Sequence, residues 1–134
     1  MSKYVRITVP RLTDLDLLKR TLVKLGFPDT EIQDVQMRKH PGLKVDKSVW
    51  GGMLPITFEF AEAQSTFECC GDEDDGPRIA RWLHRENPLY SHRRFPDGLA
   101  QWYTLTAAIE ALESEGLSTE LRAEEGGRLR VLAA

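Results

Sequence analysis

The chain has 134 residues, with 18 Lys and Arg against 21 Asp and Glu, so its formal net charge is −3. This length fits one globular domain over residues 1–134 that buries about two-thirds of its unfolded surface. The hydrophobic fraction of 41% argues against a disordered chain. The mild acidity excludes a uniformly basic nucleic-acid-binding protein but leaves room for a local basic patch.

Targeting and redox signals point to the cytoplasm. The sequence contains no run of about 20 predominantly apolar residues, which a membrane span requires. The N-terminus lacks the apolar stretch and small-residue cleavage site of a secretory signal. The two cysteines, Cys69 and Cys70, are adjacent, as suits a reducing compartment better than a disulfide framework. We therefore expect a cytoplasmic protein with no membrane partner.

The N-terminal third predicts a strand followed by a helix. Residues 4–9 alternate between apolar and polar side chains, which is typical of a half-buried strand. Thr13 is expected to cap a helix that ends at Gly26. Its apolar stripe has helical spacing and consists of Leu15, Leu18, Leu22 and Leu25.

The middle of the chain predicts two antiparallel hairpins. Residues 32–38 and 43–49 read as strands joined by a Pro-Gly turn at residues 39–42. The second hairpin comprises the alternating stretches 56–60 and 67–69. Between the hairpins, the sequence Trp50-Gly51-Gly52 predicts a flexible loop.

The C-terminal half predicts two helices and a final hairpin. An acidic loop precedes a short helix at residues 78–86, which Asn87-Pro88 ends. Asp97 is expected to open a longer helix that Gly116 closes, followed by a hairpin at residues 117–131. The core face of the longer helix is expected to contain Leu99, Trp102, Thr106, Ile109 and Leu112.

These elements predict an α+β fold, because strands gathered in runs do not alternate strictly with helices. We expect a single two-layer domain with a mostly antiparallel sheet and about three helices packed on one face. The predicted core includes Leu15, Leu18, Leu22, Phe58, Trp102 and Ile109.

The two ends of the chain carry a family resemblance. The start, through Leu12-Thr13-Asp14-Leu15 and Leu25-Gly26-Phe27, resembles a cyanobacterial and algal-plastid family. That family is known as hypothetical chloroplast reading frame thirty-five, within domain of unknown function twelve fifty-seven. The segment from Trp102-Tyr103 through Glu113-Ser114-Glu115-Gly116-Leu117 resembles the family's tail. The resemblance implies an α+β domain, no established activity, and an AAA-class ATPase as a partner.

Motifs for catalysis or metal binding are absent from the sequence. It has no Gly-x-Ser-x-Gly elbow, phosphate-binding loop or dinucleotide fingerprint. His40, His84 and His92 lack the spacing of a zinc site, and four carboxylates follow the cysteine pair instead of the positive setting of a reactive thiol. We expect no catalytic residues, no metal and no cofactor. The alternative that the protein is an enzyme with an unrecognised site stays open.

One charge pattern has a defined geometry. Arg78, Arg81 and Arg85 are spaced to project from one helix face, beside Trp82. Residues 77–94 carry a local charge of +4, whereas residues 110–125 carry −5. The candidate protein- or phosphate-binding residues are Arg78, Arg81, Trp82, Arg85, Tyr90, Arg93 and Arg94. The alternative is that this helix face has no binding role and is simply solvated, with its arginines paired to the acidic loop at residues 72–75.

We therefore expect a small accessory or adaptor protein that acts through contacts with a partner protein or with a second copy of itself. Opposite charge poles and exposed sheet edges both favour docking. The first alternative is a nucleic-acid-binding module that uses the segment from Arg78 to Arg94, since arginines beside aromatic rings grip phosphates and stack on bases. The second alternative is the enzyme with an unrecognised site.

Overall fold

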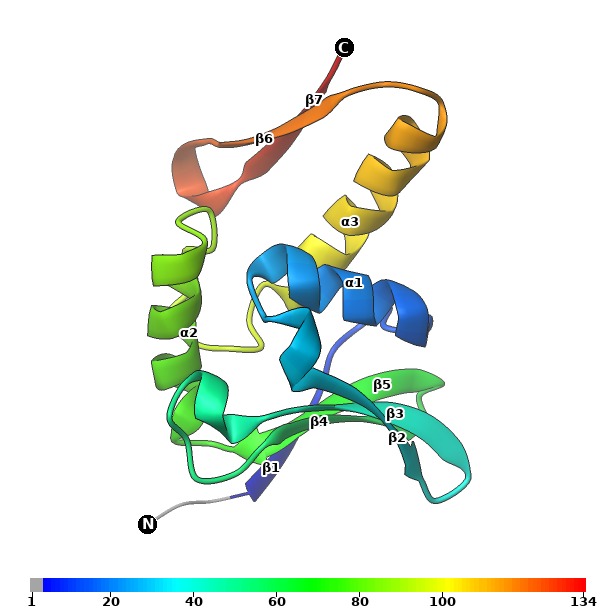
Figure 1. Ribbon diagram of the computed structural model, residues 1–134, viewed down its shortest axis with the longest axis vertical. Coiled ribbons are helices and arrows are strands. Elements are labelled where there is room, and N and C mark those ends of the chain that lie inside the picture. Colours follow the sequence, from blue (N-terminus) through cyan, green and yellow to red (C-terminus); the bar gives the residue numbers. More distant parts are fainter. Residues whose placement is uncertain (1–3) are drawn as a thin grey trace.

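The computed structural model describes residues 4–134 and has an α+β fold, as the sequence predicts (Figure 1). Five strands form an antiparallel sheet in the order β1-β5-β4-β3-β2. They are β1 (Tyr4–Thr8), β2 (Ile32–Met37), β3 (His40–Val45), β4 (Ile56–Ala61) and β5 (Thr66–Asp72). The helices are α1 (Leu15–Leu25), α2 (Asp75–Glu86) and α3 (Leu99–Ser114), and a separate hairpin consists of β6 (Thr119–Ala123) and β7 (Leu129–Ala133).

All three helices lie on the same side of the five-stranded sheet (Figure 1). Only α1 lies between the sheet and another helix: α3 packs on the far side of α1, and α2 lies next to the C-terminal end of α1. The helix α3 packs mainly against α1, and the exposed residues of α2 keep one face of that helix in solvent. Within residues 4–134, no helix is both long and apolar enough to cross a bilayer.

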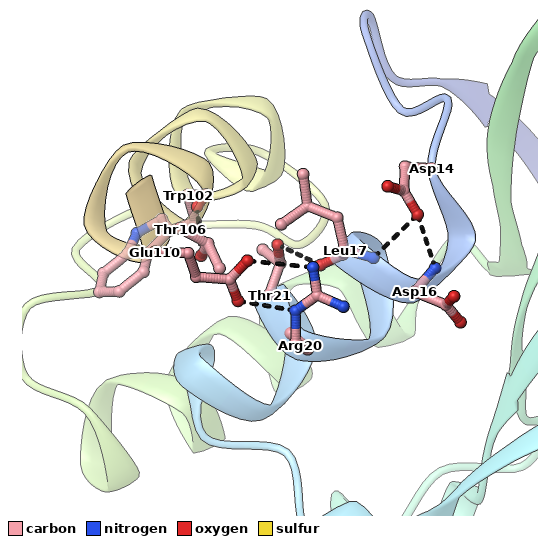
Figure 2. Close-up of polar contacts among 8 residues, drawn as sticks. All are labelled: Asp14, Asp16, Leu17, Arg20, Thr21, Trp102, Thr106 and Glu110. Carbon is pink, nitrogen blue, oxygen red and sulfur yellow. Dashed lines mark hydrogen bonds and ion pairs between the residues drawn. The ribbon is translucent and has the colours of Figure 1, made fainter. Parts of the chain in front are cut away.

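The start of α1 differs from its prediction by one residue. Asp14, and not Thr13, is the N-cap, because its carboxylate accepts hydrogen bonds from the backbone N–H groups of Asp16 and Leu17 at 3.0 and 3.2 Å (Figure 2). A carboxylate also interacts favourably with the positive end of the helix dipole. At the other end, the N–H of Gly26 donates to the carbonyls of Leu22 and Val23, so the helix ends where predicted.

The contact between α1 and α3 combines a buried core with an exposed ion pair. Arg20 of α1 holds the carboxylate of Glu110 of α3 through two hydrogen bonds, of 2.7 and 3.0 Å (Figure 2). Leu15 and Leu112 are only half-buried, contrary to the prediction, although Leu15 still packs against the core. The remaining predicted core residues are buried, namely Leu18, Leu22, Phe58, Leu99, Trp102, Thr106 and Ile109.

The first hairpin turns two residues earlier than predicted. Met37 pairs with His40, so the turn is Arg38-Lys39, with Arg38 at a φ of 51°. Pro41 and Gly42 lie inside β3, which ends at Val45; a short 3-10 helix (Lys47–Val49) takes the rest of the predicted strand. A Cβ atom at Gly42 would overlap the carbonyl oxygen of Phe58. Glycine is therefore needed at position 42 because β3 and β4 approach closely there, and not because of the turn.

The helices of the C-terminal half also begin at residues other than those predicted. The helix α2 starts at Asp75 instead of Arg78, because Pro77 is tolerated in the first turn, where backbone N–H groups have no helical partner. Gly98, and not Asp97, is the N-cap of α3. The final hairpin begins at Thr119 and is extended by mutual hydrogen bonds between Ser118 and Ala134.

Candidate functional site

The helix α2 is held firmly by one face and by its C-terminal cap. Ile79, Ala80 and Leu83 are buried in the core. The N–H of Asn87 donates to the carbonyl of Leu83 at 2.7 Å, and the Asn87 amide donates to the carbonyl of Leu25, at the end of α1, at 3.1 Å. The buried face and the cap fix the direction in which the opposite, arginine-bearing face projects.

A hollow of about 850 Å³ opens over the exposed side of α2. We call it the arginine groove. Its lining comes from α2, from residues 91–93 of the loop that leads to α3, and from Trp50, which is bonded to Asp75 at the start of α2. The α2 side chains that line it are Arg78, Ala80, Arg81, Trp82, His84 and Arg85, and the loop contributes Ser91, His92 and Arg93.

The arginines of the groove differ in their partners. Arg78 donates to Oδ1 of Asp75 at 3.2 Å and to the carbonyl of Gly51 at 3.3 Å. Across residues 4–134, the side chains of Arg81, Arg85 and Arg93 have neither an ion pair nor a hydrogen bond. Pairing with the acidic loop therefore accounts for Arg78 but leaves three guanidinium groups facing solvent.

Two tryptophans give the groove an apolar component. The Trp82 ring lies 5.4 Å from the ring of Phe27, centroid to centroid, and stays half-exposed on its other side. Trp50 is 7% exposed, and its indole Nε1 donates to Asp75. The segment around Trp50 is thus anchored, contrary to the flexible loop that its two glycines suggested. Nothing in the local sequence of Trp50 indicated its contact with α2, 25 residues away.

A hydrogen bond to α2 fixes the loop whose residues 91–93 line the groove. Nδ1 of His84 lies 2.7 Å from the carbonyl oxygen of Tyr90. A carbonyl only accepts, so Nδ1 carries the hydrogen. The Tyr90 ring is fully buried, with its hydroxyl within 2.8 Å of the Arg94 carbonyl and 2.6 Å of the Asp97 carbonyl. Tyr90 therefore anchors the loop in the core and does not line the groove.

Arg94 also points away from the groove. Its guanidinium donates to the carbonyl of Glu73 at 3.3 Å and lines a second, smaller hollow of about 420 Å³ beside β1 and β5. The structure thus gathers Arg78, Arg81, Trp82, Arg85 and Arg93 around one groove and leaves out Tyr90 and Arg94. Five of the lining residues were not predicted from the sequence, namely Trp50, Ala80, His84, Ser91 and His92. For all of them except Trp50, the neighbouring arginines were the only sequence feature that indicated a place in the groove.

Within the described part of the chain, the cysteines and the Ser91–His92 pair form no second site. Cys69 and Cys70 are free thiols inside the sheet. Burial, together with the nearby Glu59 carboxylate, raises the pKa of Cys70 to about 11, and burial also raises the pKa of Cys69. Ser91 and His92 are not hydrogen-bonded to each other; the His92 ring instead approaches Gln101 at 3.4 Å. Over residues 4–134, no three His, Cys, Asp or Glu side chains converge as metal ligands.

Comparisons with protein-family models, with curated proteins and with solved structures found no match.

Proposed function

We propose that this protein is an accessory or adaptor protein and that the arginine groove is its docking site for a partner protein. One observation carries the proposal: Arg81, Arg85 and Arg93 surround an open hollow next to Trp82 and have no partner within residues 4–134. Arginine and tryptophan contribute much of the energy of protein interfaces. Unpaired guanidinium groups also steer an oppositely charged partner toward the groove.

The test uses a charge reversal that spares the fold. Arg78 is left unchanged, because a glutamate at its position would repel the buried carboxylate of Asp75. The variant is Arg81→Glu/Arg85→Glu/Arg93→Glu, and the control is Arg38→Glu/Lys39→Glu, at the exposed β2–β3 turn on the side of the molecule away from α2 (Figure 1). Each tagged protein is incubated with an extract of its source cells, and captured proteins are quantified by mass spectrometry.

We expect at least one protein to be recovered by the wild type and the control but lost with the groove variant, at unchanged melting temperature. An AAA-class ATPase, implied as a partner by the family resemblance, is the first candidate. If all three proteins capture the same partners in the same amounts, the groove is ordinary solvated surface and the proposal is wrong.

A further inference from the structure

We propose that the arginine groove binds a short, extended acidic segment of the partner protein, about five residues long, with carboxylates at alternate positions. This inference rests on the proposed function and adds the chemistry of the partner. Its starting point is the three guanidinium groups, Arg81, Arg85 and Arg93, that line the groove without a partner in residues 4–134. Guanidinium groups bind carboxylates through two parallel hydrogen bonds, a geometry that lysine does not reproduce.

The spacing of the two α2 arginines matches an extended peptide. Arg81 and Arg85 are four residues apart on one helix, so their positions are separated by about 6 Å along its axis. In an extended chain, side chains on the same side recur every two residues, at about 6.6 to 6.8 Å. Carboxylates at alternate positions of a peptide lying along α2 therefore meet Arg81 and Arg85 in turn. Arg93, from the loop that leads to α3, adds a third positive charge to the same groove.

Negative charges at both ends of α2 limit the length of this segment. Asp74 precedes the helix and Glu86 is its last residue; both are exposed, and neither has an ion pair with any residue of 4–134. The 12 residues of α2 extend over about 18 Å. About five residues of extended peptide cover that distance. A longer polyanion would be repelled by Asp74 at one end and by Glu86 at the other.

The aromatic residues favour a peptide over a nucleic acid. Binding of single-stranded nucleic acid relies on open ring faces on which bases stack. One side of the Trp82 ring is packed against Phe27, and Trp50 is 7% exposed with its indole nitrogen bonded to Asp75. What remains open is part of Trp82, which suits an aliphatic or aromatic side chain within the acidic segment.

The test is a titration with a designed probe. A fluorescein-labelled peptide contains Asp-Leu-Asp-Phe-Asp between Gly-Ser flanks, and its matched control has Asn in place of every Asp. Fluorescence anisotropy is recorded against wild-type protein at low and physiological salt. We expect saturable binding of the acidic peptide that weakens with salt, and affinity for the Asn peptide lower by at least about tenfold.

Protein variants locate the site. Arg81→Glu/Arg85→Glu should weaken binding of the acidic peptide by at least about tenfold, and Arg93→Glu, outside α2, should weaken it as well. The control Arg38→Glu/Lys39→Glu changes the charge by the same amount as the double groove variant and should bind within about twofold of wild type. Melting temperatures are measured for every variant, and the Arg93→Glu result remains informative if the α2 substitutions disturb the helix.

Three outcomes would overturn the inference. If wild-type protein does not bind the acidic peptide while proteins captured from the extract still depend on the groove, the proposed function stands and the acidic segment is wrong. Equal binding by the groove and control variants would locate the peptide elsewhere. Tighter binding of a single-stranded RNA 15-mer than of the peptide would make the groove a nucleic-acid site.

Discussion

The indole Nε1 of Trp50 donates a 3.1 Å hydrogen bond to Oδ2 of Asp75, the first residue of α2. The other oxygen of the same carboxylate accepts from Arg78 at 3.2 Å. The Asp75 side chain is 5% exposed. One buried carboxylate thus joins the segment after β3 to the first turn of α2 and holds the end of the arginine groove in shape.

Replacing Asp75 by Ala should lower the free energy of unfolding by about 1–3 kcal/mol, because the indole N–H of Trp50 loses its acceptor in a buried setting. Asp74→Ala is the matched control. Asp74 is exposed, and its side chain makes no capping hydrogen bond, so only its interaction with the helix dipole is lost, at less than about 1 kcal/mol. Urea unfolding compares the two variants. Equal losses would show that the contact with Trp50 adds no stability.

Two glycines at the ends of α3 provide a second matched pair. Gly98 has a φ of 82° and Gly116 a φ of 85°. Alanine at either position should cost about 1–2 kcal/mol of unfolding free energy from backbone strain. A Cβ atom at Gly98 would also overlap the His92 imidazole, whereas a Cβ atom at Gly116 would meet nothing within 4 Å.

We therefore expect Gly98→Ala, but not Gly116→Ala, to move His92 at the rim of the groove. The readout is the ring resonances of His92 in proton–carbon NMR spectra, with urea unfolding recorded alongside. Unchanged His92 resonances in Gly98→Ala would contradict the tight packing of the ring against Gly98.

Leu18 tests the buried face of α1. It is fully buried, so Leu18→Ala should reduce the free energy of unfolding by about 2–5 kcal/mol through lost burial and a cavity. Val23 lies on the same helix and is 41% exposed, so Val23→Ala should change stability by less than about 0.5 kcal/mol. Chemical denaturation measures both, and a loss below about 0.5 kcal/mol for Leu18→Ala would mean that this position does not belong to the core.

Stability should fall in alkaline solution. Burial and the nearby Glu59 carboxylate raise the pKa of Cys70 from 9.0 to about 11. The folded protein therefore favours the neutral thiol, and the stability this provides is complete below about pH 9 and is lost as the pH rises toward 11. The buried Cys69 and Tyr90 have raised pKa values as well and act in the same direction.

Urea unfolding of wild type and Cys70→Ala at several pH values between 8 and 11 separates these contributions. We expect the variant to lose less stability than wild type across this range and to retain the remaining fall caused by Cys69 and Tyr90. Parallel curves for the two proteins would show that Cys70 does not titrate differently in the folded and unfolded chains.

Local patterns in the sequence were sufficient for the elements whose structure depends on near neighbours. The leucines of α1 recur with helical spacing, and the alternation from Ile56 to Phe60 specifies a strand. The shared face of Arg78, Arg81 and Arg85 follows from the period of the helix alone, so the candidate docking face could be predicted before any packing was known. The helix starts at Thr13, Arg78 and Asp97 were wrong, because neighbouring residues serve equally well as first residues or caps.

The tertiary structure decided which of those arginines are free. Arg78 is paired because the backbone around Trp50 and the carboxylate of Asp75 come together, and Arg93 joins Arg81 and Arg85 because His84 holds the loop at Tyr90. The burial of Tyr90 and the turning away of Arg94 have the same origin. Each of these outcomes depends on contacts made only once the chain has packed, and no periodicity or capping signal in a short stretch of sequence carries that information.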